Sequence, residues 1–191
     1  MASGCGERRE QRVHQMPRRH VVIYPHPALT TPGREVCEVD DDLRALVSDM
    51  VETMHAEVGV GLAANQVDDL RRVFVLDLSA GEEPGAVKVM INPVIVEQVG
   101  RQTGEEGCLS FPGIFEHVER PARIRVRYRD LDFEEVEEEI DEFYARVVCH
   151  ETDHLDGIVF LKRMSPLKRR LTLKKIEKLK RQGEWPAAAA L

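Results

Sequence analysis

The sequence predicts an α+β fold, a single domain in which mixed or antiparallel sheets pack around a central helix, with a further helix at the C-terminus. Three observations lead to this expectation. The chain has 191 residues, of which 42% are hydrophobic, enough for one domain with a core and too few for two. Apolar residues recur at helical spacing in two segments, and cap signals begin a third helix. Between the first two helical segments lie short runs rich in β-branched residues, which are typical of strands.

Three helices are expected. Residues 42–56 carry an apolar stripe with steps of three and four, and residues 141–155 repeat at the same spacing. The third helix begins at Ser165 and Pro166, because serine is a good N-cap and proline fits the first helical position, and it continues to about Arg181. The stripe of the first helix consists of Leu43, Leu46, Val47, Met50, Val51 and Met54.

Three strands are expected at residues 73–78, 87–99 and 124–131. In the last of them apolar side chains alternate with arginines, as expected of a sheet with one face toward solvent, so the sheet is antiparallel or mixed. The alternating residues are Ile124, Val126 and Tyr128 on one face and Arg125, Arg127 and Arg129 on the other.

The chain divides into three parts. Residues 1–19 are polar, rich in arginine and without periodicity, which predicts a flexible extension. Residues 20–182 form the domain, and residues 183–191 are expected to be a frayed tail. No stretch approaches the ~20 apolar residues of a membrane span, and no secretory signal begins the chain. We therefore expect a cytoplasmic protein without membrane contact, with an organelle as the alternative location.

Charge is distributed unevenly along the chain. The net charge is −7, yet residues 162–181 carry ten Lys or Arg and a single acid, Glu177. Residues 130–142 hold nine Asp or Glu in thirteen positions. The basic segment therefore predicts an acidic partner, and the alternative is a solvated helix face.

The sharpest local pattern is His150-Glu151-Thr152-Asp153-His154. Four residues of helix bring the two imidazoles to one face, where both can reach one metal ion. Glu151 then lies beside the open position of the metal and can take a proton from water, as in many metal hydrolases. The central helix is thus expected to bind a metal.

Such a site needs a third ligand. The candidates are Asp153, Asp156, a downstream His or Glu, and Cys108. The four cysteines have irregular spacing in a chain without an export signal, so a disulfide framework is not expected and a thiol is free for chemistry. Cys108 follows a glycine in the segment EGCLS, but a lone cysteine is most often a buried small side chain. The residues alone leave this choice open.

The glycine-rich segment GVGLAANQ follows the first helix. It lacks the spacing and the lysine of a phosphate-binding loop. Gly59 fits a helix C-cap, and Leu62 to Ala64 are expected to pack inward. Gln66 is then the polar group that can donate a hydrogen bond into a site.

Together GVGLAANQ, EGCLS and HETDH occur in the order and approximate spacing of the peptide deformylase family, which this sequence resembles over roughly residues 20–182. The resemblance implies a deformylase-like catalytic domain that includes the basic C-terminal helix. Two positions depart from the family pattern: Cys149 stands where Gln is common, and Glu142 where Gly is frequent. Cys149 is one step from His150 on the helix and is expected to turn away from the ligands and pack.

The resemblance also implies roles for individual residues. The implied metal ligands are Cys108, His150 and His154, with Glu151 as general acid and base. The Gln66 side-chain amide and the Leu109 backbone N–H are implied to form an oxyanion hole. Val60 and Gly61 are implied to pair with the substrate backbone and to help form the methionine pocket, and Val147, one turn before His150, is a further candidate wall of that pocket.

The implied reaction is hydrolysis of the N-formyl group from the initiator methionine of nascent polypeptides, with release of formate. The resemblance implies one divalent metal, ferrous iron in the cell, with zinc, nickel or cobalt able to replace it. It also implies that the basic C-terminal helix docks on the ribosome. Two other hypotheses are a zinc endopeptidase, which would cleave peptides without a formyl group, and a non-catalytic ribosome-binding module. Glu151 and Gln66 argue against the second, because a structural metal site needs neither a base nor an oxyanion donor.

Overall fold

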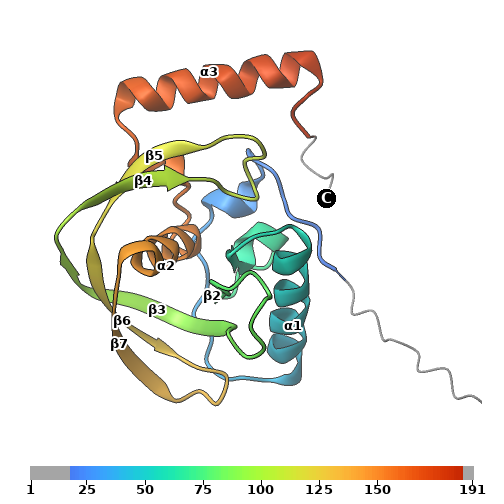
Figure 1. The fold of residues 1–191 in the computed structure, drawn as a ribbon. Coiled ribbons are helices and arrows are strands. Elements are labelled where there is room, and N and C mark those ends of the chain that lie inside the picture. The colour runs from blue at the N-terminus through green and yellow to red at the C-terminus, as the bar shows by residue number, and fades with distance from the viewer. Residues whose placement is uncertain (1–17, 187–191) are drawn as a thin grey trace, which may run out of the picture.

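A computed structural model describes residues 18–186 and confirms the α+β prediction. Figure 1 shows helix α2 (Glu142–Leu155) in the middle of the molecule, helix α1 (Asp41–Ala56) at one side and helix α3 (Pro166–Gln182) across the outside. The strands are β1 (Gly61–Ala63), β2 (Val73–Leu76), β3 (Lys88–Val99), β4 (Gln102–Glu106), β5 (Glu116–Arg120), β6 (Arg123–Arg129) and β7 (Glu135–Asp141).

The strands form two antiparallel sheets, as expected. One has five strands in the order β1-β2-β3-β6-β7, and the other is the hairpin β4-β5. Helix α2 lies between the large sheet and this hairpin (Figure 1). Strand β1 is an edge strand, so one side of its backbone has no neighbouring strand of that sheet. The sequence did not indicate β1 or the hairpin, because a three-residue strand in a glycine-rich segment and the polar run QTGEE carry no alternation of apolar residues.

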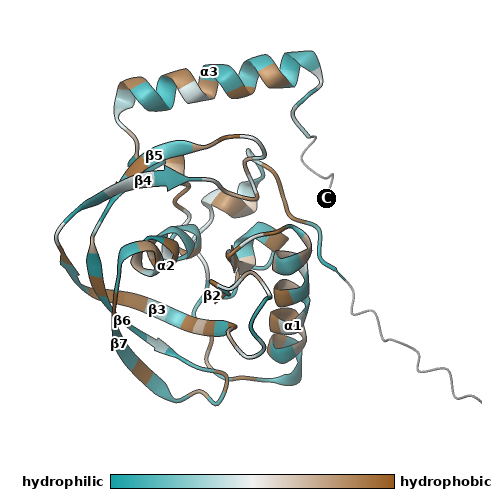
Figure 2. Cartoon of the chain, in the orientation of Figure 1, coloured by the Kyte–Doolittle hydropathy of each residue, from teal (hydrophilic) through white to brown (hydrophobic). Residues whose placement is uncertain are grey.

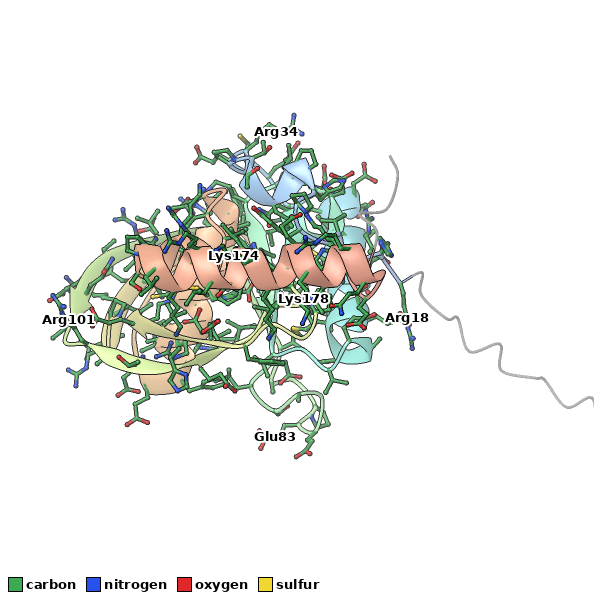
Figure 3. The ribbon with its side chains drawn as sticks, turned by 90° about the horizontal axis from the view of Figure 1, so that it is seen from above. Arg18, Arg34, Glu83, Arg101, Lys174 and Lys178 are labelled. Carbon is green, nitrogen blue, oxygen red and sulfur yellow. The ribbon has the colours of Figure 1, made fainter. Side chains whose placement is uncertain are left out.

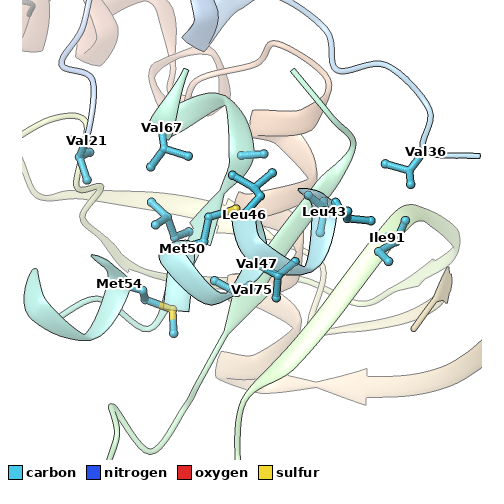
Figure 4. Close-up of a cluster of buried hydrophobic side chains, with 13 residues drawn as sticks. Val21, Val36, Leu43, Leu46, Val47, Met50, Met54, Val67, Val75 and Ile91 are labelled. Carbon is cyan, nitrogen blue, oxygen red and sulfur yellow. The ribbon is translucent and has the colours of Figure 1, made fainter. Parts of the chain in front are cut away.

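Helix α1 begins directly after its N-cap residue, Asp40. The Asp40 carboxylate accepts a hydrogen bond from the Leu43 N–H at 2.7 Å, which satisfies one of the free donors at the helix start. Figure 4 shows the predicted stripe, apart from the partly buried Val51, in one buried core cluster that also includes Val67. This core holds the segment that follows α1, including β1, against the rest of the domain.

The acidic segment, residues 130–142, is largely a strand, which its composition did not predict. Strand β7 pairs with β6, and its glutamates meet the arginines on the solvent face of that strand. Arg125 lies 2.7 Å from Glu97 and 3.5 Å from Glu137, and the Arg123 and Glu139 side chains are 3.2 Å apart. The other face of β6 is buried, as the alternation predicted.

Helix α3 begins at the predicted cap, where Ser165 Oγ accepts from the Lys168 N–H at 3.3 Å. Its inner face is anchored by buried Thr172 and Ile176, whereas most of its cationic side chains are exposed. Figure 2 shows the hydrophilic bands of α3, and Figure 3 shows Lys174 and Lys178 on this helix as it crosses the molecule. No helix among residues 18–186 is long and apolar enough to cross a membrane.

Residues on both sides of the predicted domain, residues 20–182, also make contacts with it. The Arg19 guanidinium lies 3.0 Å from the Asp49 carboxylate, and the buried Trp185 indole donates to the Tyr24 carbonyl at 2.8 Å. Trp185 thus packs where the sequence indicated a frayed tail. Residues 1–17 and 187–191 lie outside the described part of the chain.

Candidate active site

Helix α2 carries His150 and His154 one turn apart on the same face. Their ring centroids are 5.1 Å apart, and both residues are buried. The helix is fixed in the middle of the molecule because its other apolar residues, such as Ala145 and Val148, pack against the large sheet. Local helical periodicity and core packing together therefore position the two imidazoles.

Cys108 comes from a different part of the chain, two residues after the end of β4. Its Sγ lies 3.3 Å from His154 Nε2, and one ligand atom from each of Cys108, His150 and His154 lies within 4.8 Å of the others. One thiolate and two imidazoles are donors that suit zinc and other first-row transition metals. The three residues fit a metal ion, and they form the sole such cluster found among the described residues.

The aspartates that were candidates for the third ligand point elsewhere. Both oxygens of Asp153 accept hydrogen bonds from arginines, one from Arg120 and both from Arg163. Asp156 accepts from Arg72 at 2.8 Å. Among the described residues, Cys108 is thus the candidate for the third ligand that reaches the two histidines.

A buried carboxylate orients the first histidine. His150 Nδ1 lies 3.0 Å from Glu106 Oε2, so the ring can donate from this nitrogen and leave Nε2 free for a metal. Arg120 and Arg146 donate to the same carboxylate at 2.8 to 3.0 Å. Burial alone would raise the pKa of Glu106, but the hydrogen bonds from His150 and Arg120 hold that pKa well below its usual value.

Glu151 is also buried, and its carboxylate is only partly satisfied by hydrogen bonds. Its Oε2 has no hydrogen-bond partner among the described residues. Burial raises the pKa of its carboxyl to about 7, and a nearby cation would lower that pKa again. Gly61 lies so close that a Cβ there would be 2.6 Å from Glu151 Oε1. The absence of a side chain at residue 61 therefore makes room for this carboxylate.

The Gln66 amide is held in one orientation. Its Oε1 accepts from the Ala63 N–H at 2.9 Å, which turns the Nε2 donor toward Cys108 Sγ at 3.5 Å and Ser110 Oγ at 3.3 Å. The short 3-10 helix η2 (Ala64–Val67) places Gln66 here, directly after β1. A hydrogen-bond donor thus faces the thiol of the cluster, as the sequence indicated.

These residues line one cavity of about 460 Å³. The predicted pocket residues Val60, Gly61 and Val147 lie in its wall, as does Leu109. Its lining also includes three exposed apolar side chains, Val58, Phe115 and Phe143. All the predicted site residues except His154 therefore line one cavity, and His154 contacts Cys108, which lines it.

Comparison with known proteins decides the family. The model of the polypeptide deformylase family matches residues 18–170. The chain belongs to the peptide deformylase family. It is 47% identical over 167 residues to a peptide deformylase of Acidobacterium capsulatum, covering 87% of this chain and 98% of that relative. A peptide deformylase structure from Legionella pneumophila has a TM-score of 0.80 and 34% identity, covering 89% of this chain and all of that one. A structure from Thermotoga maritima has a TM-score of 0.73 and 40% identity, with 78% of this chain covered and 99% of that one.

Membership establishes the reaction class. The enzyme is a metal-dependent hydrolase that deformylates nascent peptides, and its Cys-His-His group could hold the metal. The endopeptidase and the non-catalytic module are not favoured by any of these comparisons.

The two departures from the deformylase pattern lie away from the ligands. Cys149 is buried on the other side of α2, and burial raises the pKa of its thiol to about 11, so it is protonated and packs. Glu142 has a φ of +48°, a backbone conformation that favours glycine. This conformation gives a physical reason for the glycine that is frequent there in the family.

Several residues around the site had no predicted role. Glu106 and Ser110 stand in the EGCLS motif but were assigned no role from the sequence, and Arg146 gave no signal of its own. Arg146 donates to Glu106 and also to the Val118 carbonyl of β5 at 2.9 Å. Its helical position alone cannot show this, because its partners are 28 to 44 residues away in sequence.

Proposed function

We propose that Cys108, His150 and His154 hold one divalent metal ion and that Glu151 moves the proton in deformylation. The observation that carries this proposal is the clustering of the three ligand atoms beside a buried carboxylate that has a free oxygen. A structural metal site would need no such carboxylate. The donor set, one thiolate with two neutral imidazoles, leaves room in a four-coordinate site for water or substrate.

When bound, the metal supplies a Lewis acid that polarises the formyl carbonyl and makes water acidic near neutral pH. Glu151 accepts a proton as the water oxygen forms its bond to the formyl carbon. Gln66 Nε2 and the Leu109 N–H donate hydrogen bonds to the oxygen that becomes negative. Glu151 then returns the proton to the amine nitrogen as the carbon–nitrogen bond breaks, which yields formate and a free N-terminus.

Substrate binding follows from the position of β1. An edge strand can pair with an extended peptide, and Val60 and Gly61 lie at the start of this edge and in the cavity wall. Val147 adds an apolar wall one turn before His150. These residues are suited to hold the backbone and the side chain of formyl-methionine.

The first experiment measures formate release from a formyl-Met-Ala-Ser peptide by anaerobically purified protein. Glu151→Ala and Cys108→Ala are expected to lower kcat by ~10²-fold or more, in line with the loss of other groups that act on the transition state. Cys37→Ala is the matched control, because Cys37 is an exposed free cysteine outside the site. Full activity in Cys108→Ala would contradict the ligand assignment.

The proposed native metal is ferrous iron, with zinc, nickel or cobalt as replacements, since thiolate and imidazole suit all four. An iron-loaded enzyme with a thiolate ligand should lose activity in air through oxidation. Anaerobic and aerobic preparations are therefore compared, with the nickel-loaded enzyme as the control. Equal activity of the iron-loaded preparations would contradict the predicted oxygen sensitivity of the iron form.

We place the reaction in the cytoplasm, at the ribosome, with α3 as the docking element. Exposed Lys174 and Lys178 lie on this helix within a segment of net charge +9, which complements ribosomal RNA. Changing both lysines to glutamate keeps the buried Thr172 and Ile176 that anchor α3. The charge reversal should weaken co-sedimentation with ribosomes and reduce its salt dependence while leaving peptide turnover unchanged. Unchanged co-sedimentation across a salt series would overturn the docking role.

A further inference from the structure

A row of charged side chains connects His150 to the far side of α2. Glu106 accepts from His150 and from Arg120, whose guanidinium donates to both carboxylate oxygens at 2.9 and 3.0 Å. The third nitrogen of Arg120 donates to Asp153 at 2.5 Å. Arg163 donates to both oxygens of the same aspartate, one of them at 2.8 Å. The row therefore ends at Arg163, the last residue of the 3-10 helix η3 (Phe160–Arg163).

Burial distinguishes the end of this row from its middle. Arg120, Glu106 and Asp153 are 4%, 5% and 5% exposed, whereas the Arg163 side chain is 44% exposed. Arg163 lines a second cavity, with Asp153 and Cys149, that shares no lining residue with the substrate cavity. A substitution of Arg163 therefore leaves the lining of the substrate cavity unchanged.

The hydrogen bonds of Arg120 to Glu106 and Asp153 fix the orientation of these side chains and also balance their charges. A guanidinium is planar, so two carboxylates that bind different edges of Arg120 fix both its position and its plane. That plane in turn fixes the Glu106 oxygen that faces His150 Nδ1. Partners of this kind set the tautomer and ring orientation of a metal-binding histidine, and their loss typically weakens metal binding.

We propose that Asp153 and Arg163 are positioning residues for His150, acting through Arg120 and Glu106. This inference rests on the proposed function, in which His150 is a metal ligand. Asp153, between the two histidines of HETDH, then has a role distinct from theirs. Because none of Asp153, Arg120 and Arg163 lines the substrate cavity, their loss affects the metal and kcat and leaves KM unchanged.

The test compares Asp153→Asn, Arg163→Gln, the double variant and Arg163→Lys in the full chain. Cobalt affinity is measured by chelator competition, with the thiolate-to-cobalt absorption band as an independent report on the site, and kcat and KM are measured with a formyl-methionine peptide. We expect a loss of ~10-fold in cobalt affinity for Asp153→Asn and ~3-fold for Arg163→Gln, at and below the lower end of the usual range for such partners. The double variant should match Asp153→Asn, and lysine should restore part of the Arg163 effect.

Arg101→Gln is the matched control. Arg101 lines the same second cavity but pairs with the exposed Glu119, so cobalt affinity and kcat should equal those of the wild type. If Asp153→Asn fails to fold, Arg163→Gln, at a half-exposed position, still decides the question.

Two results would overturn the proposal. In one, the Arg163 and Asp153 variants bind cobalt as the wild type does and only the melting temperature of the metal-free protein falls, which is a purely structural role. In the other, KM rises with kcat unchanged. A separate variant, His150→Ala, tests the underlying assignment: wild-type cobalt affinity there would contradict the metal site itself rather than the positioning row.

Discussion

Two regions of this molecule pair arginine with glutamate and use the pairs differently. On the β6-β7 face, Arg125, Glu97 and Glu137 are each about half exposed, and water competes for both charges. Around α2, Glu106 and Arg120 are almost fully buried, and their charges are paired with each other inside the protein. Exposed pairs contribute ~0–1 kcal/mol, whereas removing one partner of a buried pair costs ~3–5 kcal/mol. The same residue types thus make a solvated sheet surface in one place and orient a candidate metal ligand in the other.

The largest effect is expected for Glu106→Gln, which removes the charge that two arginines and His150 share. We expect the metal-free protein to lose ~3–5 kcal/mol of unfolding free energy, measured by urea denaturation at pH 7. Glu105→Gln is the matched control, because Glu105 is the adjacent residue and is exposed. A loss in Glu106→Gln no larger than in Glu105→Gln would break the comparison.

The pH dependence of stability gives a second test of Glu106. Its folded-state pKa is lowered because hydrogen bonds from His150 and Arg120 outweigh burial, so its contribution is fully present above the usual pKa of 4.5 and declines as the pH falls below that value. Unfolding free energy of the metal-free wild type should therefore fall toward acid more steeply than that of Glu106→Gln. Parallel curves between pH 7 and pH 3.5 would contradict the lowered pKa.

Arg146→Met tests a buried arginine that donates hydrogen bonds to a backbone carbonyl as well as to a carboxylate. The substitution keeps the apolar stem but removes the donor to Glu106 and to the Val118 carbonyl. Because Arg120 and His150 still pair with Glu106, the expected cost is that of buried acceptors left without one partner, a loss of ~1–3 kcal/mol in urea denaturation. An effect below ~0.5 kcal/mol would mean that water replaces the guanidinium.

Glu142→Gly concerns an exposed glutamate for which backbone conformation matters more than charge. At φ +48° a residue with a Cβ is strained, and glycine should raise the unfolding free energy by ~1 kcal/mol. Thermal melts of the wild type and the variant measure this difference. A lower melting temperature in the variant would show that Glu142 stabilises the start of α2 through its side chain.

The smallest effect is expected for Arg125→Gln on the exposed sheet face. Although Arg125 contacts two glutamates, the substitution should change the unfolding free energy of the protein by less than ~0.5 kcal/mol. The change should be smaller still in high salt. Comparison with Arg146→Met under the same conditions isolates the influence of burial. A loss as large as that of Arg146→Met would show that the surface pairs act as a cooperative network.

Much of the framework could be predicted because its signals are local. Helices α1 and α2 have apolar residues at helical spacing, α3 has a serine cap followed by proline, and β6 alternates apolar and arginine residues. Strand β7 was missed because its acidic composition conceals the alternation. It becomes a strand through pairing with β6, whose arginines form ion pairs with its glutamates on one face.

The sequence by itself determined that His150 and His154 share a face with Glu151 beside them, because a helix fixes the relation of residues four apart. It could only nominate Cys108, since the distance of that thiol from His154 depends on how the β4-β5 hairpin packs against α2. The tertiary structure alone decided the role of Glu106, whose partners are 14 to 44 residues away in sequence. Contacts between distant segments depend on packing of the whole domain, and no local periodicity records them.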